Sequence, residues 1–504
     1  MIADPASEWM KAAVALVFAE DLGTSRRFVP VIATDESSAY RGQAAEMLET
    51  TVEERRGRIH VEAFLRDLKT QRNRRMVKGA GPAAGLIATL DALAKRIDAD
   101  AADYSTRNQQ ALRAFAAAAQ TSDTKKQVEA LNRAIALDPG FGMAYVSAIH
   151  VLTTANPGGV KALLAKARAH EKTFTPLDRA RFDELASRLA HAPLQQRASA
   201  ASALLRIAPN NLDALTGLAA VRFLQGDENG VALLKRASEV DPGNVSIQMH
   251  LAGGLLETKQ FPKAEKIFQS LAGDPDILPD LAACILLEGD PARADSVFQK
   301  YLRQIEKSKA PFAPLAEANW LAISGKMPQA ISRLEAAQFA QPDLQSIAWS
   351  QIAVWQAAGG KVAGAKRSAA QGTKLAKAAI ARVFAQVAIL IANADLPPAE
   401  WRTKVEASPL NSGTRQTVLG YGFFLFGHYA QAAQVWRALL KASGNADLRA
   451  RAMLASSLEH SGKKADAGKI LVQPFLPNLT GGDPYAAIAF AQMRQMTRRM
   501  LKSH

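Results

Sequence analysis

The sequence has very few residues of the kind that staple small domains or hold metals. A single cysteine, Cys284, stands among 504 residues. One thiol excludes an internal disulfide framework and any zinc cluster built from cysteines. Cys284 lies in the apolar stretch LAACILLEG, where we expect a small buried helix residue rather than a reactive thiol.

Aromatic residues are also scarce, at 6% against 48% for hydrophobic residues overall, and alanine is abundant. This composition favours close-packed helices over a β-sandwich or barrel. A chain of this length normally forms several domains, unless it grows as a one-dimensional array of repeats. We therefore expect a mainly α protein.

Long hydrophobic runs are missing. The longest candidate, AAVALVFA at residues 12–19, falls short of the ~20 residues that a membrane span needs. Acidic residues flank it, and the basic start and cleavage site of a signal peptide are lacking, so it predicts an amphipathic helix with Ser7 as N-cap. The chain as written is expected to be cytoplasmic, and a place in the periplasm or cell envelope is expected if the true start lies upstream.

Catalytic and cofactor motifs are lacking as well. The eight histidines form no HxxxH or HExxH pair, and the sequence has no GxSxG element. GAGPAAG at residues 79–85 has the wrong glycine spacing for a dinucleotide fingerprint and predicts a loop. GGKVAGAKRS at residues 359–368 has Ala365 where a P-loop has lysine, and predicts an inter-helix turn. We expect no catalytic residue, no metal and no cofactor, and we expect Glu53 and Glu54 to lie on a solvated strand.

Positive charge is concentrated in the last third of the chain. Lys and Arg outnumber Asp and Glu by 62 to 47, which gives a formal net charge of +15. Residues 1–100 hold 15 of each sign, residues 101–360 hold 27 and 25, and residues 361–504 hold 20 and 7, which leaves +13 in this last part. The candidate basic surface consists of Lys361, Lys366, Arg367, Lys374 and Lys377. It predicts either a solvated helix face or a surface that binds an acidic partner.

A glycine, or a substitute for it, recurs at a nearly constant interval. The positions are Gly226, Lys259, Gly289, Gly325, Gly360, Gly427 and Gly462. One turn of the series is missing, near ANADLPP at residues 392–398. Proline recurs with the same period, at Pro139, Pro209, Pro242, Pro275, Pro342 and Pro409. The two series together predict one unit repeated about every 34 residues.

Small and large residues follow each turn at fixed steps, as in GKMPQAISRLEAAQFAQPD at residues 325–343. Glycine makes a tight turn, small residues let two antiparallel helices approach, large residues fill the gap, and proline ends the second helix. Each unit is therefore predicted to be a helical hairpin. The predicted packing positions are Gly226, Gly289, Gly325, Ala330, Leu334, Ala337, Leu419, Gly420, Gly427, Ala432, Trp436 and Gly462.

The spacing of these glycine, alanine, leucine and proline residues resembles that of the tetratricopeptide repeat, whose unit has Leu-Gly in its first helix, Ala in its second and a closing Pro. The resemblance covers residues 104–475, about ten or eleven helix pairs. The junction ALNRAIALDPGFGMAY at residues 130–145 matches the family best, and Leu419-Gly420 keeps the full pair, whereas Gln248 and Gln416 stand where the family has Trp. The resemblance implies a right-handed superhelix of helix pairs whose concave side binds a protein or a peptide.

The first hundred residues follow a different pattern. FVPVIAT at residues 28–34 predicts a strand, and residues 47–68 predict an antiparallel hairpin that turns at Arg56-Gly57. RRMVK at residues 74–78 predicts a third strand, and residues 83–97 return to helix. The order is helix, strand, three-stranded meander, helix. One face of the hairpin is predicted to carry Ile59, Val61, Ala63 and Leu65.

This layout ahead of the repeats resembles the small α/β domain at the amino terminus of TolB. The residues that carry the resemblance are DPASEWMKAAVALVFAEDLGTSRRFVPVIA at 4–33 and RRGRIHVEAFLRDLKTQRN at 55–73. The family begins with a further apolar strand just before the position of Asp4-Pro5, so we expect the true chain to start upstream, the alternative being a sheet that lacks this strand. The resemblance implies a bacterial envelope or signalling protein, sometimes joined to a kinase or DNA-binding module.

We predict three parts: a small α/β domain at residues 1–100, helical repeats at 101–482, and a capping helix at 483–504. Residues 483–504 are predicted to form a helix that caps the array, or else a helix that lies on a membrane surface or on a partner. It sets three methionines against three arginines, namely Met493, Met496, Met500, Arg494, Arg498 and Arg499.

The function predicted is a non-enzymatic scaffold that binds a protein or peptide, with an acidic partner favoured. The alternative is a sensory or regulatory part of a bacterial signalling protein. Nucleic-acid binding is less favoured, because aromatic residues are sparse among the lysines of the last third. A membrane surface remains as a further candidate partner, and no small-molecule substrate is expected.

Overall fold

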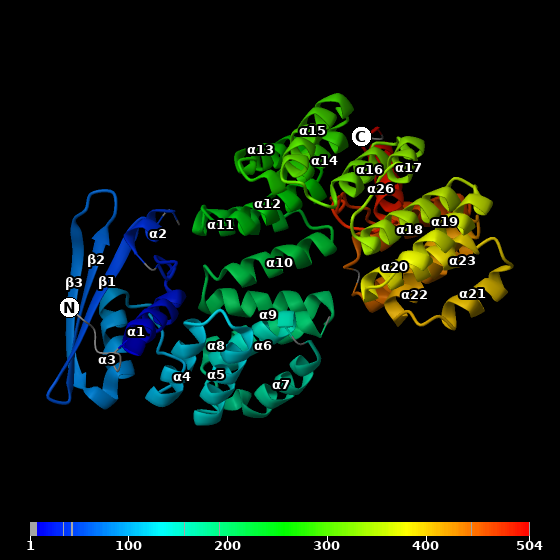
Figure 1. Cartoon of the computed structure of the whole chain (residues 1–504). Coiled ribbons are helices and arrows are strands. Elements are labelled where there is room, and N and C mark those ends of the chain that lie inside the picture. Colours follow the sequence, from blue (N-terminus) through cyan, green and yellow to red (C-terminus); the bar gives the residue numbers. More distant parts are fainter. Residues whose placement is uncertain are drawn as a thin grey trace. The chain divides into compact units, whose positions relative to one another are not determined.

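The computed structural model describes residues 8–33, 35–41, 44–155, 157–190, 192–444 and 446–502. Over these residues the chain forms 26 α-helices and three β-strands (Figure 1). This confirms the predicted fold class, a mainly α array of tetratricopeptide-like helix pairs behind a small α/β part. The chain divides into two compact units, Met1–Gln248 and Met249–His504. Ser7, the predicted N-cap, lies outside the described residues.

The three strands form an antiparallel meander in the order β1-β2-β3, as the sequence predicts. The strands are β1 (Glu46–Arg55), β2 (Arg58–Asp67) and β3 (Asn73–Pro82). Arg55 pairs with Arg58, so the hairpin turns at Arg56-Gly57, where both residues have positive φ. The predicted face of β2 is buried, at Ile59, Val61, Ala63 and Leu65. Helices α1 (Glu8–Asp21) and α3 (Leu86–Ile97) cover this face (Figure 1).

The strand predicted at residues 28–34 is wrong for its described part. Residues 28–33 have no regular secondary structure, and Thr34 lies outside the described residues. Val31 and Ile32 are 67% and 52% exposed, although their sequence is typical of a strand. A strand needs a neighbour for its backbone hydrogen bonds, and no described segment supplies one to residues 29–33. The meander is followed by η3 (Ala83–Gly85) and preceded by α2 (Glu36–Arg41) and η2 (Leu22–Thr24).

The third strand is longer than predicted, and this corrects the loop expected at residues 79–85. The first half of GAGPAAG, up to Pro82, belongs to β3, and a 3-10 turn follows. Glycine is needed there because α3 lies close to the strand. A Cβ atom on Gly81 would lie 2.4 Å from Thr89 Oγ1, and one on Gly79 would lie 3.2 Å from the Leu93 side chain. The glycines therefore serve helix-to-strand packing.

One hydrophobic core runs from the sheet into the first helix pairs. It includes Val61 of β2, Val14 of α1, Leu90 of α3 and Phe115 and Tyr145 of the following helices. The sheet therefore has no core separate from the helices next to it. The predicted boundary at residue 100 stays a prediction.

Helices α4 to α25 number twenty-two over the described residues, which makes eleven pairs in chain order, within the range expected from the period. In the first unit they are α4 (Gln109–Ala119), α5 (Thr124–Leu137), α6 (Gly142–Ala155), α7 (Pro157–His170), α8 (Pro176–Leu189), α9 (Leu194–Ile207), α10 (Leu212–Leu224) and α11 (Gly230–Val240), with η4 (Glu171–Thr173) between α7 and α8. Helix α12 (Val245–Glu257) contains the division between the units.

The second unit continues the same pattern. Its helices are α13 (Phe261–Leu271), α14 (Leu278–Glu288), α15 (Pro291–Lys307), α16 (Ala313–Ile323), α17 (Met327–Glu335), α18 (Pro342–Ala358), α19 (Val362–Leu375), α20 (Ala379–Ala392), α21 (Pro398–Glu406), α22 (Ser412–Leu425), α23 (Tyr429–Ala442), α24 (Leu448–His460), α25 (Lys464–Gly468) and α26 (Ala486–Lys502), with η5 (Pro275–Ile277) before α14. The superhelical course of the whole array stays a prediction.

The periodic glycines occupy the turns between paired helices. All six have positive φ, from 74° at Gly360 to 102° at Gly289, and the substitute Lys259 has φ 60°. Glycine adopts this conformation without the steric cost that a side chain brings. Proline has a second role that the sequence reading missed. Helix α17 ends at Glu335, so Pro342 does not end it; it is the first residue of α18, where its missing N–H costs no hydrogen bond.

Candidate protein-binding surfaces

The predicted packing positions lie where helices meet. Ala330, Leu334, Leu419 and Ala432 have no exposed surface, and Trp436 and Ala337 are also buried. A Cβ atom on Gly420 would lie 2.5 Å from the Trp436 ring, so glycine is needed at this crossing of α22 and α23. The turn positions Gly226, Gly289, Gly325, Gly427 and Gly462 have φ of 77°, 102°, 87°, 82° and 81°. These residues build the array and leave partner binding to other side chains.

The predicted basic residues lie on and around α19, and all are exposed. Lys361 is the N-cap residue of α19, three others lie within the helix, and Lys377 lies in the connection to α20. Lys366 Nζ forms an ion pair with Asp395 Oδ2 at 3.0 Å. Among the described residues, no ion pair joins Lys361, Arg367, Lys374 or Lys377 to an acidic group. Four of the five cations therefore keep their charge available to a partner.

The connection between α19 and α20 is held in place by Asp343, in the first turn of α18. Asp343 Oδ1 accepts hydrogen bonds from the backbone N–H groups of Lys377 (2.7 Å) and Ala378 (2.9 Å). These two bonds, with the charges of Lys377 and Arg382 nearby, hold the pKa of Asp343 below its usual value. Ser346 Oγ adds a bond to the Gly372 carbonyl at 2.7 Å. The basic end of α19 is thus fixed against α18.

The sequence reading missed the course of the C-terminal segment. Residues 469–485, between α25 and α26, have no regular secondary structure and cross several earlier helices of the second unit (Figure 1). Asn319 Nδ2 on α16 donates to the carbonyls of Leu479 (2.8 Å) and Gly481 (3.0 Å), and Gln351 Nε2 on α18 donates to Asn319 Oδ1 (2.9 Å). Trp355 Nε1 donates to the Pro484 carbonyl at 3.0 Å. The first helices of these pairs therefore bind the segment mainly through its backbone.

The two ends of the segment are held by side chains. Gln473 accepts from Arg451 Nη1 (2.8 Å) on α24 and donates to Glu257 Oε2 (3.0 Å) on α12. Burial raises the pKa of Glu257 to about 7, and the charge of Arg451 opposes this rise. At the other end Tyr485 stacks on Tyr421 of α22, with ring centroids 4.0 Å apart.

Helix α26, expected as a cap, lies against α24 and also against α16. Its buried side includes Phe490 and Met493, and Met496 is half-buried. The side chains of residues 498–502, including Met500, Arg498 and Arg499, lie outside the described ones. Helix α26 and the segment before it form part of the core of the second unit, since Val472, Leu479 and Tyr485 are buried too.

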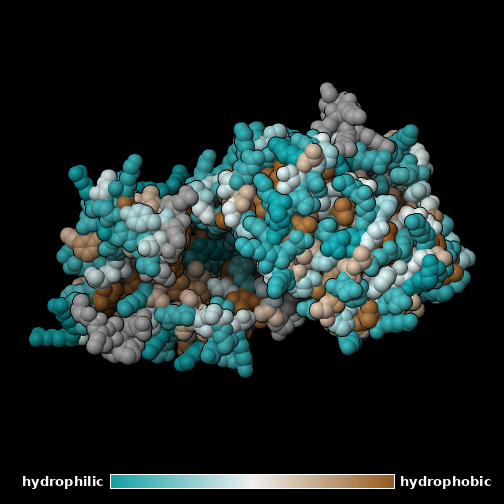
Figure 2. Space-filling model, turned by 45° about the horizontal axis from the view of Figure 1, so that its top comes forward, coloured by the Kyte–Doolittle hydropathy of each residue, from teal (hydrophilic) through white to brown (hydrophobic). Residues whose placement is uncertain are grey.

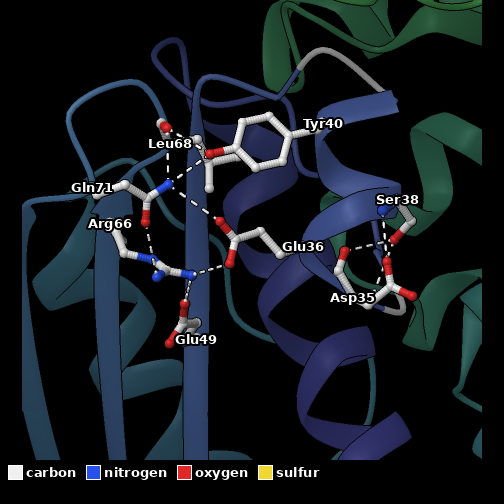
Figure 3. Close-up of polar contacts among 8 residues, drawn as sticks. All are labelled: Asp35, Glu36, Ser38, Tyr40, Glu49, Arg66, Leu68 and Gln71. Atoms are coloured by element: carbon white, nitrogen blue, oxygen red, sulfur yellow. Dashed lines mark hydrogen bonds and ion pairs between the residues drawn. The ribbon is translucent and has the colours of Figure 1, made fainter.

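A polar network at the sheet was a second candidate site (Figure 3). Arg66 of β2 forms ion pairs with Glu36 of α2 (3.1 Å) and with Glu49 of β1. Gln71 Nε2 donates to Tyr40 Oη (2.6 Å) and to the Leu68 carbonyl (3.0 Å). These contacts attach α2 to the end of the hairpin, and the network is accounted for by that structural role.

The described residues offer no cluster of metal ligands, no exposed thiol and no membrane-spanning helix. They contain no group of three His, Cys, Asp or Glu side chains placed to hold a metal ion. Cys284 is buried as expected, its Sγ lies 3.7 Å from the Phe261 carbonyl, and burial raises the pKa of the thiol. None of the described helices is both long and apolar enough to cross a membrane. On the face shown in Figure 2, hydrophilic residues predominate and hydrophobic residues lie in separate patches.

Comparisons with known proteins give a distant likeness to solved helical proteins. No protein-family model matches the sequence, and no curated protein matches it. Naa15/Naa10 bound to HypK-THB is 13% identical with a TM-score of 0.25, over 72% of this chain and 63% of that one. Ypp1 is 12% identical with a TM-score of 0.38, over 73% of this chain and 59% of that one.

The TPR domain of P58(IPK) is 14% identical with a TM-score of 0.19, over 76% of this chain and 95% of that one. The chain thus spans about 60% of the length of the first two proteins, Naa15/Naa10 and Ypp1.

Proposed function

We propose that the protein is a non-enzymatic scaffold that binds a protein or peptide partner through its tetratricopeptide-like array. The observation that carries the proposal is the run of eleven helix pairs, α4 to α25. Stacked helix pairs present long continuous surfaces whose side chains are free for recognition, because the packing positions lie inside the pairs. The described residues also hold no metal-binding group, and the single thiol is buried.

The chemistry proposed for the partner is acidic. Residues 361–504 carry 20 basic and 7 acidic residues, a net charge of +13, and four of the five candidate basic residues have no ion pair with a described residue. Such a surface attracts negatively charged partners and speeds their encounter. An acidic protein fits best, since the lysines of α19 have few aromatic neighbours on which nucleic-acid bases could stack.

The experiment is affinity capture on the immobilised full chain, with captured proteins identified by mass spectrometry and their binding then measured as purified components. We expect the captured partner to lose affinity between about 0.05 M and about 0.5 M salt, because exposed charges are screened over shorter distances as salt rises. Reversing Lys366, Arg367 and Lys374 to Glu should slow association more than it speeds dissociation.

The matched control reverses Lys441, Lys463 and Lys464, which are exposed, lie in the same third of the chain and change the net charge equally. Single-stranded DNA and anionic vesicles serve as competitors. A partner that binds equally at both salt concentrations and ignores the first triple reversal would show that α19 is a solvated face. Failure to capture any protein that rebinds in purified form would contradict the scaffold function itself.

A second candidate function is a regulatory part of a bacterial signalling protein, with a TolB-like amino-terminal domain. The observation that favours it is the continuous core that joins the sheet to the first helix pairs, because a change at one would be felt at the other. An in-frame kinase, DNA-binding or membrane-spanning coding region directly upstream would support this candidate. An upstream stop codon would rule it out.

A further inference from the structure

The basic residues of α19 fall into two groups that lie at opposite ends of α20. Lys366, in the first half of α19, forms an ion pair with Asp395, which lies three residues after the last residue of α20. Lys374 and Lys377, at the other end of α19, lie next to the first turn of α20. Helix α20 has 14 residues and is therefore about 21 Å long. A small ligand bound at one group would not touch the other.

The second group lies just before two apolar side chains of α20 that are open to solvent. Ile380 and Val383 lie one turn apart on α20 and are 57% and 37% exposed. Leu471 is the third exposed large hydrophobic residue among the described residues of the second unit. Two of the three thus share one face of one helix, where i and i+3 residues are neighbours.

Three cations lie near Ile380 and Val383 along the chain: Lys374 in the last turn of α19, Lys377 three residues before Ile380, and Arg382 directly before Val383. All three are exposed, and none forms an ion pair with a described residue. The carboxylate of Asp343 lies close by, but its Oδ1 is already occupied by two backbone N–H groups. The α20 patch, defined as Ile380, Val383, Lys374, Lys377 and Arg382, therefore combines two exposed apolar side chains with three exposed cations that lie close to them along the chain.

The patch adjoins the place where the chain binds its own C-terminal segment. A Cβ atom on Gly482 would lie 2.5 Å from Ile347 of α18 and 3.5 Å from the Phe384 ring of α20. Phe384 follows Val383 directly and lies one turn after Ile380. The apolar surface that receives Gly482 therefore continues into the exposed side chains of the patch.

The segment that already occupies this surface shows which chemistry the surrounding helices bind. Asp483 forms an ion pair with Arg449 of α24, and Tyr485, two residues later, stacks on Tyr421. An acidic residue and a large apolar residue lie close together in the sequence, and the Pro484 carbonyl between them accepts a hydrogen bond from Trp355. An external segment with the same order of residues would match the α20 patch in charge and in apolar surface.

We propose that the α20 patch is a docking site for an extended segment of an acidic protein, in which one large apolar side chain contacts Ile380 and Val383 and neighbouring Asp or Glu side chains contact Lys374, Lys377 and Arg382. This rests on the proposed function and names the site and the partner chemistry for it. Most of the affinity would come from the buried apolar side chain, and the cations would set the preference for acidic neighbours.

The test uses random dodecapeptides displayed on phage and selected on the immobilised full chain. The most enriched peptide is then synthesised with a fluorescent label, and its Kd is measured by fluorescence anisotropy. We expect enriched peptides to contain a large apolar residue within three positions of Asp or Glu. The Ile380→Ser, Val383→Ser double variant and the Lys377→Glu, Arg382→Glu double variant should each weaken binding at least about tenfold, as expected for a central contact and for reversed charges.

The controls are Leu471→Ser, which removes an equally exposed hydrophobic residue elsewhere in the unit, and the Lys463→Glu, Lys464→Glu double variant. Both should change Kd by less than about twofold, because surface substitutions away from a contact have small effects. All variants change exposed side chains, and their thermal unfolding curves should match that of the unmodified chain.

Each other outcome overturns the assignment in a different way. Peptides that bind equally well to the patch variants would leave the scaffold function standing and place recognition elsewhere. Failure to enrich any peptide would count against both the docking site and the proposed function. Single-stranded DNA or phosphatidylserine vesicles that need the patch, where no peptide does, would show that the partner is of another class.

Discussion

Asp21 offers a test of how the α/β part is joined to the first helix pairs. It is the last residue of α1, has no exposed surface, and receives no hydrogen bond on either carboxyl oxygen from a described residue. Burial, and then the neighbouring carboxyl group of Asp91, raises the pKa of Asp21 to about 10. Asp91 itself is paired with Arg107, so it is Asp21 that holds the proton. At neutral pH the folded chain must therefore bind a proton that the unfolded chain does not.

The perturbation is Asp21→Asn, which removes this requirement. Below the ordinary pKa of 3.8 both states are protonated, and the group has no effect on stability. As pH rises from there towards the folded pKa, the unfolded state loses its proton and the free energy of unfolding falls by about 1.4 kcal/mol per pH unit. About three pH units separate 3.8 from pH 7, so Asn can stabilise the first unit by at most about 4 kcal/mol at pH 7. We expect about 3 kcal/mol, because the buried amide is not fully hydrogen-bonded either.

The assay is urea unfolding followed by fluorine NMR on fluorotryptophan-labelled protein. Trp9 on α1 reports on the first unit, and the other five of the six tryptophans lie in the second unit and serve as internal controls. The gain at Trp9 should be near zero at pH 4 and largest at pH 7, and Asp100→Asn, at an exposed position, should change little. A loss of stability at pH 7, or an equal gain at both pH values, would refute the assignment of a buried proton to Asp21.

Three further predictions concern the array. Gly422→Ala would place a Cβ atom 2.0 Å from the buried Trp401 ring and should lower the free energy of unfolding in urea by about 3 kcal/mol. Gly325→Ala meets open space at φ 87° and should lower it by only about 1 kcal/mol. Equal losses would count against close packing of Trp401 on Gly422. Lys259→Gly should raise the unfolding free energy of the second unit by about 1 kcal/mol, because glycine adopts the positive φ of 60° at this turn without strain. A decrease would show that the Lys259 side chain stabilises the unit by more than the strain costs. Ala330→Leu should destabilise by about 1 to 3 kcal/mol, because the site is completely buried; an unchanged thermal midpoint would contradict the close packing of α17.

The turns and the hairpin could be predicted because their causes are local. Glycine at a tight turn reflects the positive φ of that one residue, and all six predicted glycines have it. The alternation around Ile59 and Val61 likewise follows from the two faces of a strand. FVPVIAT was misread because its residues suit a strand, while strand formation depends on a partner elsewhere in the fold.

The candidate site was less accessible to sequence reasoning. The charge of the last third and the position of Lys374 and Lys377 follow from counting and from the repeat register. The pairing of Lys366 with Asp395, and the exposure of Ile380 and Val383, depend on which helix faces solvent, and apolar α20 gives no sign of it. One feature of the sequence could have indicated that the C-terminal segment packs on α16 and α18. The polar residues Asn319 and Gln351 stand at positions that the repeat pattern buries, where they need hydrogen-bond partners.

The contact between Gln473 and Glu257 spans 216 residues of sequence, and this bears on synthesis of the chain. At about 5 to 20 residues per second, some 10 to 40 s pass on the ribosome between the two. During that time α16 and α18 can pair with their neighbours, but Asn319 and Gln351 have no segment to bind. The second unit is therefore expected to become resistant to protease only once residues 469–485 have left the ribosome, and nascent chains stalled before residue 470 should still be cleaved within it.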